Sequence, residues 1–204
     1  MLEAAGCGGL CRLGLDCAAS HFYDSHNAFY RFWGREAGWD ELIQYFEVLS
    51  TSYGLLLLED PLEEDDFDGY AEITRRVPSR IVGHDLFAMN LERLTRGVAV
   101  GAANGLILKP NMVGTITEAL VAARYAADNG YLVVGSCRAG GTVATGAPLI
   151  KLGAPRTGER LNLQNCFLRV EEELGAATVS AGPRVRCAAA APTPPGAARV
   201  PEGA

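Results

Sequence analysis

Short apolar runs alternate with amphipathic stretches along most of the sequence. The run Leu55–Leu58 is apolar without a break, which is typical of a strand buried on both faces. Residues 115–130 show the clearest helical pattern, because Thr115 and Glu118 can form a capping box and Gly130 is a stop signal. Across the chain the pattern predicts strands at residues 12–16, 55–59, 80–85, 105–109, 131–136 and 149–153, and helices at 39–54, 65–77, 90–100, 115–130 and 158–175.

This alternation predicts parallel strands joined by crossover helices. A (β/α) barrel and an open doubly wound sheet both fit the order of elements. Polar side chains favour the barrel, because several stand at or just beyond the carboxyl ends of different predicted strands: Asp16, Glu59, Asp85, Lys109 and Arg138. A barrel brings these ends together in one mouth, where its active sites lie. We therefore expect an α/β fold, an incomplete TIM-type barrel with about six of the eight strands that close such a barrel.

The composition changes after Gly175. Residues 176–204 are rich in Ala, Pro and Gly and have no apolar period. Such a segment buries too little surface to offset the entropy of ordering it. We expect a folded domain at residues 1–175 and a disordered tail at 176–204.

The bulk properties restrict the class of protein. The 204 residues carry a net charge of −6, which argues against general nucleic-acid binding. No apolar run is long enough to cross a bilayer, and the first residues lack the basic start and apolar stretch of a signal peptide. We expect a cytoplasmic protein without nucleic-acid or membrane partners, whose cysteines are reduced.

The acidic residues at the strand ends suggest a metal site. Asp16 and Glu59 would emerge at the same mouth, where carboxylates repel one another unless a hard cation such as Mg²⁺ lies among them. Lys109 ends another strand, and a lysine facing a bound cation in a partly desolvated mouth can act as a base. The less specific interpretation is that such acids are helix N-caps, for which Asp60 and Asp66 are candidates.

Several motifs occur in a defined order at these strand ends. They are "GLDCAAS", "LEDPLEEDDFDGY", "IVGHDLFAMN", "LILKPNMVGTITEA", "NGYLVVGSCRAGGT" and "GERLNLQNCFLRVEEELG". In these motifs the sequence resembles enolase (phosphopyruvate hydratase) over most of residues 1–175. The resemblance implies the enolase C-terminal barrel domain. It also implies a glycolytic carbon–oxygen lyase that interconverts 2-phosphoglycerate and phosphoenolpyruvate with Mg²⁺.

The resemblance also implies roles for individual residues. Asp16 and Glu59 match two of the three magnesium carboxylates, and Glu59 also lies at the substrate. Lys109 matches the base that removes the proton next to the substrate carboxylate. Lys151 matches a lysine that contacts this carboxylate. Arg138 matches the arginine that holds the substrate phosphate, and its neighbours Ser136, Cys137 and Ala139 complete that motif.

The sequence departs from the family pattern at some of these positions. His84 stands at the third metal-ligand position, and Asp85 follows it as a possible substitute. Imidazole suits Mn²⁺ or Zn²⁺ better than Mg²⁺, so His84 is either a lost magnesium ligand or a ligand for another metal. Cys137 replaces a substrate-contacting histidine, and Ala139 replaces a serine.

A larger departure concerns the front of the domain. The first predicted strand, at residues 12–16, matches the third barrel strand of the family, so the family's N-terminal domain and first two barrel strands have no counterpart here. We expect the exposed parallel edges to drive formation of a homo-oligomer or association with another enolase chain. Three functions stay open: a lyase, weak or inactive as the isolated chain; a pseudoenzyme that acts as a binding or assembly partner; and a truncated gene product.

Overall fold

The computed structural model describes residues 4, 6–7, 11–136 and 145–178. Its centre is a six-stranded sheet in the order β1-β5-β6-β7-β8-β9, in which every neighbouring pair is parallel. The strands are β1 (Gly14–Asp16), β5 (Leu57–Glu59), β6 (Arg80–Gly83), β7 (Gly105–Leu108), β8 (Leu132–Ser136) and β9 (Leu149–Lys151). The helices are α1 (Trp39–Tyr53), α2 (Phe67–Arg76), α3 (Leu91–Val100), α4 (Ile116–Asp128) and α5 (Gly158–Leu174). Each predicted strand and helix is present, with shifts of a few residues at the ends.

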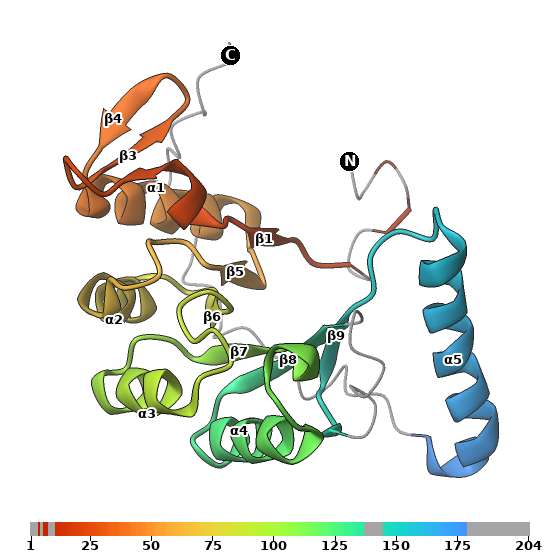
Figure 1. The fold of residues 1–204 in the computed structure, drawn as a ribbon. Helices are drawn as coiled ribbons and strands as arrows, with labels where there is room; N and C mark the ends of the chain where they lie inside the picture. Colours follow the sequence, from red (N-terminus) through yellow and green to blue (C-terminus); the bar gives the residue numbers. More distant parts are fainter. Residues whose placement is uncertain (1–3, 5, 8–10, 137–144, 179–204) are drawn as a thin grey trace.

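The sheet is curled. If it were flat, its edge strands β1 and β9 would lie roughly 24 Å apart, because neighbouring strands are about 4.8 Å apart. Instead, Lys151 of β9 donates a hydrogen bond to Asp16 of β1 over 2.8 Å. Helices α1 to α4 lie along the outer side of this curl, in an arc that follows the strand order (Figure 1). The predicted incomplete barrel is therefore confirmed.

The strands are buried on both faces, as the leucine run predicts. Leu58, Ile81 and Leu106 point outward and pack in the main core beneath the helices. The alternate residues belong to a second, smaller cluster on the inner face, formed by Val82, Ile107 and Val134 with Leu57, Leu132 and Leu149 packed against it. The period-two alternation of side chains thus separates two cores across one sheet.

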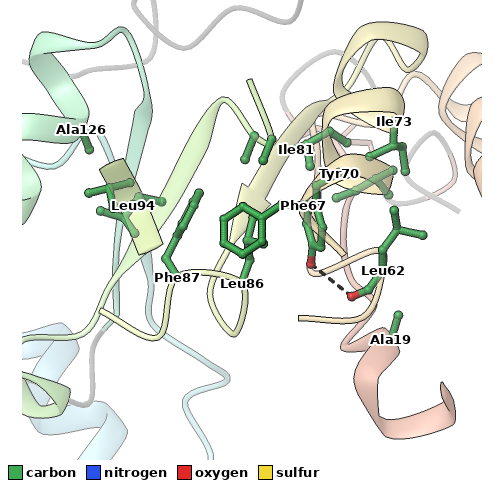
Figure 2. Close-up of a cluster of buried hydrophobic side chains, with 14 of the residues drawn as sticks. Ala19, Leu62, Phe67, Tyr70, Ile73, Ile81, Leu86, Phe87, Leu94 and Ala126 are labelled. Atoms are coloured by element: carbon green, nitrogen blue, oxygen red, sulfur yellow. Dashed lines mark hydrogen bonds between the residues drawn. The ribbon is translucent and has the colours of Figure 1, made fainter. Parts of the chain in front are cut away.

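The main core is aromatic where α2 and α3 meet the sheet. Figure 2 shows Phe67, Tyr70 and Phe87 in one cluster with Ile81 and Leu94, all fully buried. Helix α2 begins where the Asp66 side chain accepts a hydrogen bond from the backbone N–H of Gly69, so Asp66 is the helix N-cap. Its last turn carries Arg75 and Arg76, which favour the negative end of the helix dipole.

One element was not predicted from the sequence. An antiparallel ribbon of three short strands, β2 (Tyr23–Asp24), β3 (Phe29–Phe32) and β4 (Arg35–Ala37), lies between β1 and α1. Tyr30 anchors it in the core through ring contacts with Phe22 and Tyr23. The exposed Trp33 contacts the ring of Tyr45 on α1, so the ribbon packs against this helix.

Helix α5, near the carboxyl end of the chain, packs less closely than the other helices. No residue of α5 is buried within the described chain, and Leu161, Leu168 and Leu174 are exposed. A short 3-10 turn, Gly175–Ala177, follows this helix. Residues 179–204, nearly all of the predicted tail, lie outside the described residues. Among the residues that the structure describes, no helix is both long and apolar enough to span a membrane.

Candidate functional site

The six strands place one polar residue each at the same rim of the sheet. Because the strands are parallel, their carboxyl ends share one edge, where Asp16 pairs in register with Glu59 and Ser136 with Lys151. His84 directly follows β6, and Lys109 directly follows β7. The rim residues are therefore Asp16, Glu59, His84, Lys109, Ser136 and Lys151. The predicted site residues Cys137, Arg138 and Ala139 lie outside the described residues.

Lys151 joins the two ends of the rim. Its Nζ donates to Asp16 Oδ2 over 2.8 Å and to Glu59 Oε2 over 2.7 Å. The side chain of Glu59 is only 4% exposed, whereas that of Asp16 is 53% exposed. Two carboxylates from neighbouring strands therefore share one positive charge, which Lys151 supplies from the opposite edge of the sheet.

Burial sets the protonation behaviour of this group. Burial raises the pKa of Glu59, and the hydrogen bond from Lys151 offsets this only in part. Partial burial lowers the pKa of Lys151, but its hydrogen bonds to Asp16 and Glu59 outweigh that effect, so its pKa is raised overall. Burial thus favours the neutral form of Glu59, whereas the two carboxylates favour the charged form of Lys151.

Asp60 supports the next part of the rim. It is buried, and its backbone has a positive φ of 44°. Its two carboxylate oxygens accept the backbone N–H groups of His84 and Asp85, each over 2.9 Å. The Tyr70 hydroxyl also lies 3.3 Å from Oδ1. Asp60 therefore fixes the position of the loop that carries His84, and the interpretation of Asp60 as a helix N-cap is wrong.

His84 has an oriented imidazole. Its Nδ1 lies 2.7 Å from Asp85 Oδ1 and 3.8 Å from Asp60 Oδ2. Its Nε2 is buried and makes no hydrogen bond within the described part of the chain. A carboxylate partner on one ring nitrogen fixes the tautomer, which leaves the other nitrogen as an electron-pair donor. Asp85 therefore orients His84 through a direct contact.

These donors fit a divalent cation. Glu59, Asp60 and His84 each offer a ligand atom, and the three atoms lie within 4.8 Å of one another. Asp16 and Glu59 already converge on a positive charge, the Lys151 ammonium. Carboxylate oxygens suit Mg²⁺, and the added imidazole extends the donor set toward Mn²⁺ and Zn²⁺. The sequence singled out Asp16, Glu59, His84 and Asp85, but it missed Asp60, whose positioning role depends on contacts across the sheet.

Two further side chains border the rim. The half-buried Lys109 is held by its backbone N–H, which lies 3.3 Å from the sulfur of the buried Met89. Cys17 follows Asp16, and its backbone N–H donates to the Glu59 carbonyl over 2.8 Å. Burial, and then the negative charges of Asp16, Asp60 and Glu59, raise the pKa of the Cys17 thiol far above its ordinary range. Cys17 is therefore a neutral thiol beside an acidic cluster.

Comparisons with known proteins identify the family of this fold. A family model described as "Enolase, C-terminal TIM barrel domain" matches residues 1–189. The enolase of Tropheryma whipplei (strain Twist) is 45% identical over 181 residues, which cover 83% of this chain and 42% of that protein. The enolase of Methanopyrus kandleri is 44% identical over 183 residues, covering 84% of this chain and 43% of the relative. The chain thus spans less than half the length of these curated relatives.

Proposed function

The chain belongs to the enolase family, and we propose that its rim is the catalytic half-site of an enolase-type lyase. The reaction would be the reversible dehydration of 2-phosphoglycerate to phosphoenolpyruvate with a divalent cation, slow but measurable in the isolated chain. The observation that supports this proposal is the convergence of Asp16, Glu59 and Lys151 from three strands on one point. Such a cluster of opposite charges at the mouth of a barrel is typical of a site for an anionic substrate and its metal.

Each residue has a defined task in this proposal. Asp16 and Glu59 would hold the ion, with His84 close to Glu59 as the donor that favours Mn²⁺ or Zn²⁺ over Mg²⁺. A bound divalent ion would supply charge stabilisation for the dianion that forms when a proton leaves the carbon next to a carboxylate. Lys109 would remove that proton, Lys151 would contact the substrate carboxylate, and Arg138 would hold the phosphate.

Turnover tests this proposal directly. The absorbance of phosphoenolpyruvate is followed at high concentrations of the chain, first with Mg²⁺ and then with Mn²⁺. We expect a weak signal that Lys109→Ala abolishes, because the proton acceptor is lost. The matched control is Arg124→Ala, which removes an exposed cation on the outer helix α4 and should leave the signal unchanged. Absence of turnover with both ions would contradict the lyase proposal.

The uncovered surface of α5 favours a second function. Within the described residues, α5 has no buried residue, and three exposed leucines give it apolar surface that a partner could cover. A binding or assembly partner of another enolase chain, or of a second copy, would use this surface without turnover. Light scattering after gel filtration tests this function: a monomer that does not bind a full-length enolase would contradict it.

A further inference from the structure

The position between Asp16 and Glu59 is already occupied by a cation that the chain itself provides. The Lys151 ammonium is within hydrogen-bond distance of both carboxylates, at 2.8 and 2.7 Å. A Mg²⁺ ion coordinated by the same two oxygens would lie about 2.0–2.1 Å from each of them. An ion in that position would overlap the ammonium or lie next to it, and like charges at that distance repel strongly. Only one of the two cations can therefore be there.

The presence of lysine rather than arginine at position 151 supports mutual exclusion of the two cations. Lys109 and Lys151 are the only lysines in the sequence, and the other side chains counted as positively charged at pH 7 are arginines. A lysine ammonium is a compact point charge, whereas a guanidinium is a planar fork that cannot imitate a single ion. Lys151 thus places a compact ammonium, rather than a guanidinium, between two carboxylates.

The contact also has a mechanical consequence. Lys151 is the last residue of β9, and its two ion pairs cross from one edge of the curled sheet to β1 and β5 at the other edge. Helix α5 begins a few residues after β9 and buries none of its residues in the described chain. The Lys151 ion pairs therefore tie a weakly packed end of the domain to its opposite edge.

We propose that the Lys151 ammonium and a divalent cation compete for the position between Asp16 and Glu59, so that metal binding releases β9 from β1. This inference rests on the metal site of the proposed function, but not on turnover. According to this proposal, the Lys151 ammonium neutralises Asp16 and Glu59 and thereby lowers the affinity of the chain for the metal. Removal of its charge should tighten metal binding, which is the reverse of what the loss of a ligand or of a structural contact does.

Calorimetric titration of the chain with Mg²⁺ tests the competition. We expect Lys151→Met to lower the dissociation constant about tenfold or more, a change of about 1.4 kcal/mol. The matched variant Lys151→Arg keeps a positive charge against both carboxylates and should not tighten binding. Unchanged or weaker binding in Lys151→Met would overturn the proposal, as would a similar gain in both variants.

A second measurement uses the unaltered protein, since Lys151→Met leaves two carboxylates facing one another and can fail to fold. A chain labelled with [¹³C]lysine gives NMR signals from only two lysine side chains, which Lys109→Arg assigns. The Lys151 signal should shift with Mg²⁺ along the calorimetric binding curve. A bound ion with an unmoved Lys151 signal, or no binding at all, would overturn the competition. Absence of turnover with a displaced Lys151 would remove only the lyase function.

Discussion

Lys151 Nζ and Asp16 Oδ2 lie 2.8 Å apart although 135 residues separate them in the sequence. The two residues end the opposite edge strands of the sheet, so this single contact shows that six strands already curl as a barrel does. The same contact places a positive charge between the carboxylates of two neighbouring strands. The ion pairs of Lys151 with Asp16 and Glu59 therefore belong both to the curl of the sheet and to the candidate site.

Replacing Asp60 should damage the fold more than its single charge suggests. In Asp60→Ala the partly buried N–H groups of His84 and Asp85 lose their acceptor, at about 1–3 kcal/mol each. We expect the free energy of unfolding in urea to fall by about 2–5 kcal/mol. The control Asp128→Ala removes a largely exposed carboxylate paired with Arg124 and should change the value by less than about 0.5 kcal/mol. Equal losses in both variants would rule out the positioning role of Asp60.

Replacing Gly97 with alanine should destabilise the protein, although this change normally stabilises a helix. Alanine is favoured over glycine inside a helix by about 1 kcal/mol, yet a Cβ at Gly97 of α3 would lie 2.5 Å from Cε1 of the buried Phe87. We expect Gly97→Ala to lower the midpoint of urea unfolding, with a net loss of about 1–3 kcal/mol.

Gly158 provides the matched comparison. It begins α5, and a Cβ there would meet no atom within 4 Å. Gly158→Ala should therefore be neutral or slightly stabilising. If Gly97→Ala were stabilising to the same degree, this result would contradict the tight packing of Gly97 against Phe87.

The sequence was sufficient for the features that depend on local pattern. Apolar runs located the strands, and side chains such as Asn90 and Thr115 cap the helices that they were expected to begin. Strand ends then placed Asp16 and Glu59 on one rim. Two features depend on contacts distant in sequence and could not be predicted: the anchoring of Asp60 to the loop after β6, and the bridge that Lys151 makes to Asp16 and Glu59. The β2–β4 ribbon was missed because its strands are too short to show a period.

The rate at which the Cys17 thiol is alkylated should be low, because the partly buried thiol lies beside the acidic residues of the rim. Burial and the neighbouring carboxylates raise the pKa of its thiol, so its reactive thiolate form is scarce at pH 8. We expect iodoacetamide to modify Cys17 much more slowly than the exposed Cys11 and Cys166, measured by peptide mass spectrometry. The difference should vanish in urea, where all the thiols are exposed. Rapid modification of Cys17 in the folded chain would contradict the clustering of carboxylates around it.

His84→Asp should restore a preference for Mg²⁺. The change replaces an imidazole with a carboxylate, the donor that Mg²⁺ favours, and calorimetry should show affinity for Mg²⁺ rising by about tenfold. His26→Asp is the control, because it makes the same change at an exposed turn between β2 and β3. An unchanged Mg²⁺ affinity in His84→Asp, or an equal rise in both variants, would show that His84 lies outside the metal site.

The location of a bound ion tests the central claim most directly. Crystals of the chain grown with Mn²⁺ would reveal the ion by its anomalous scattering. We predict one strong peak in coordinating contact with the carboxylates of both Asp16 and Glu59, with the Lys151 ammonium displaced from between them. A peak remote from these two carboxylates, with Lys151 still bridging them, would contradict the claim that the strand ends form a divalent-cation site.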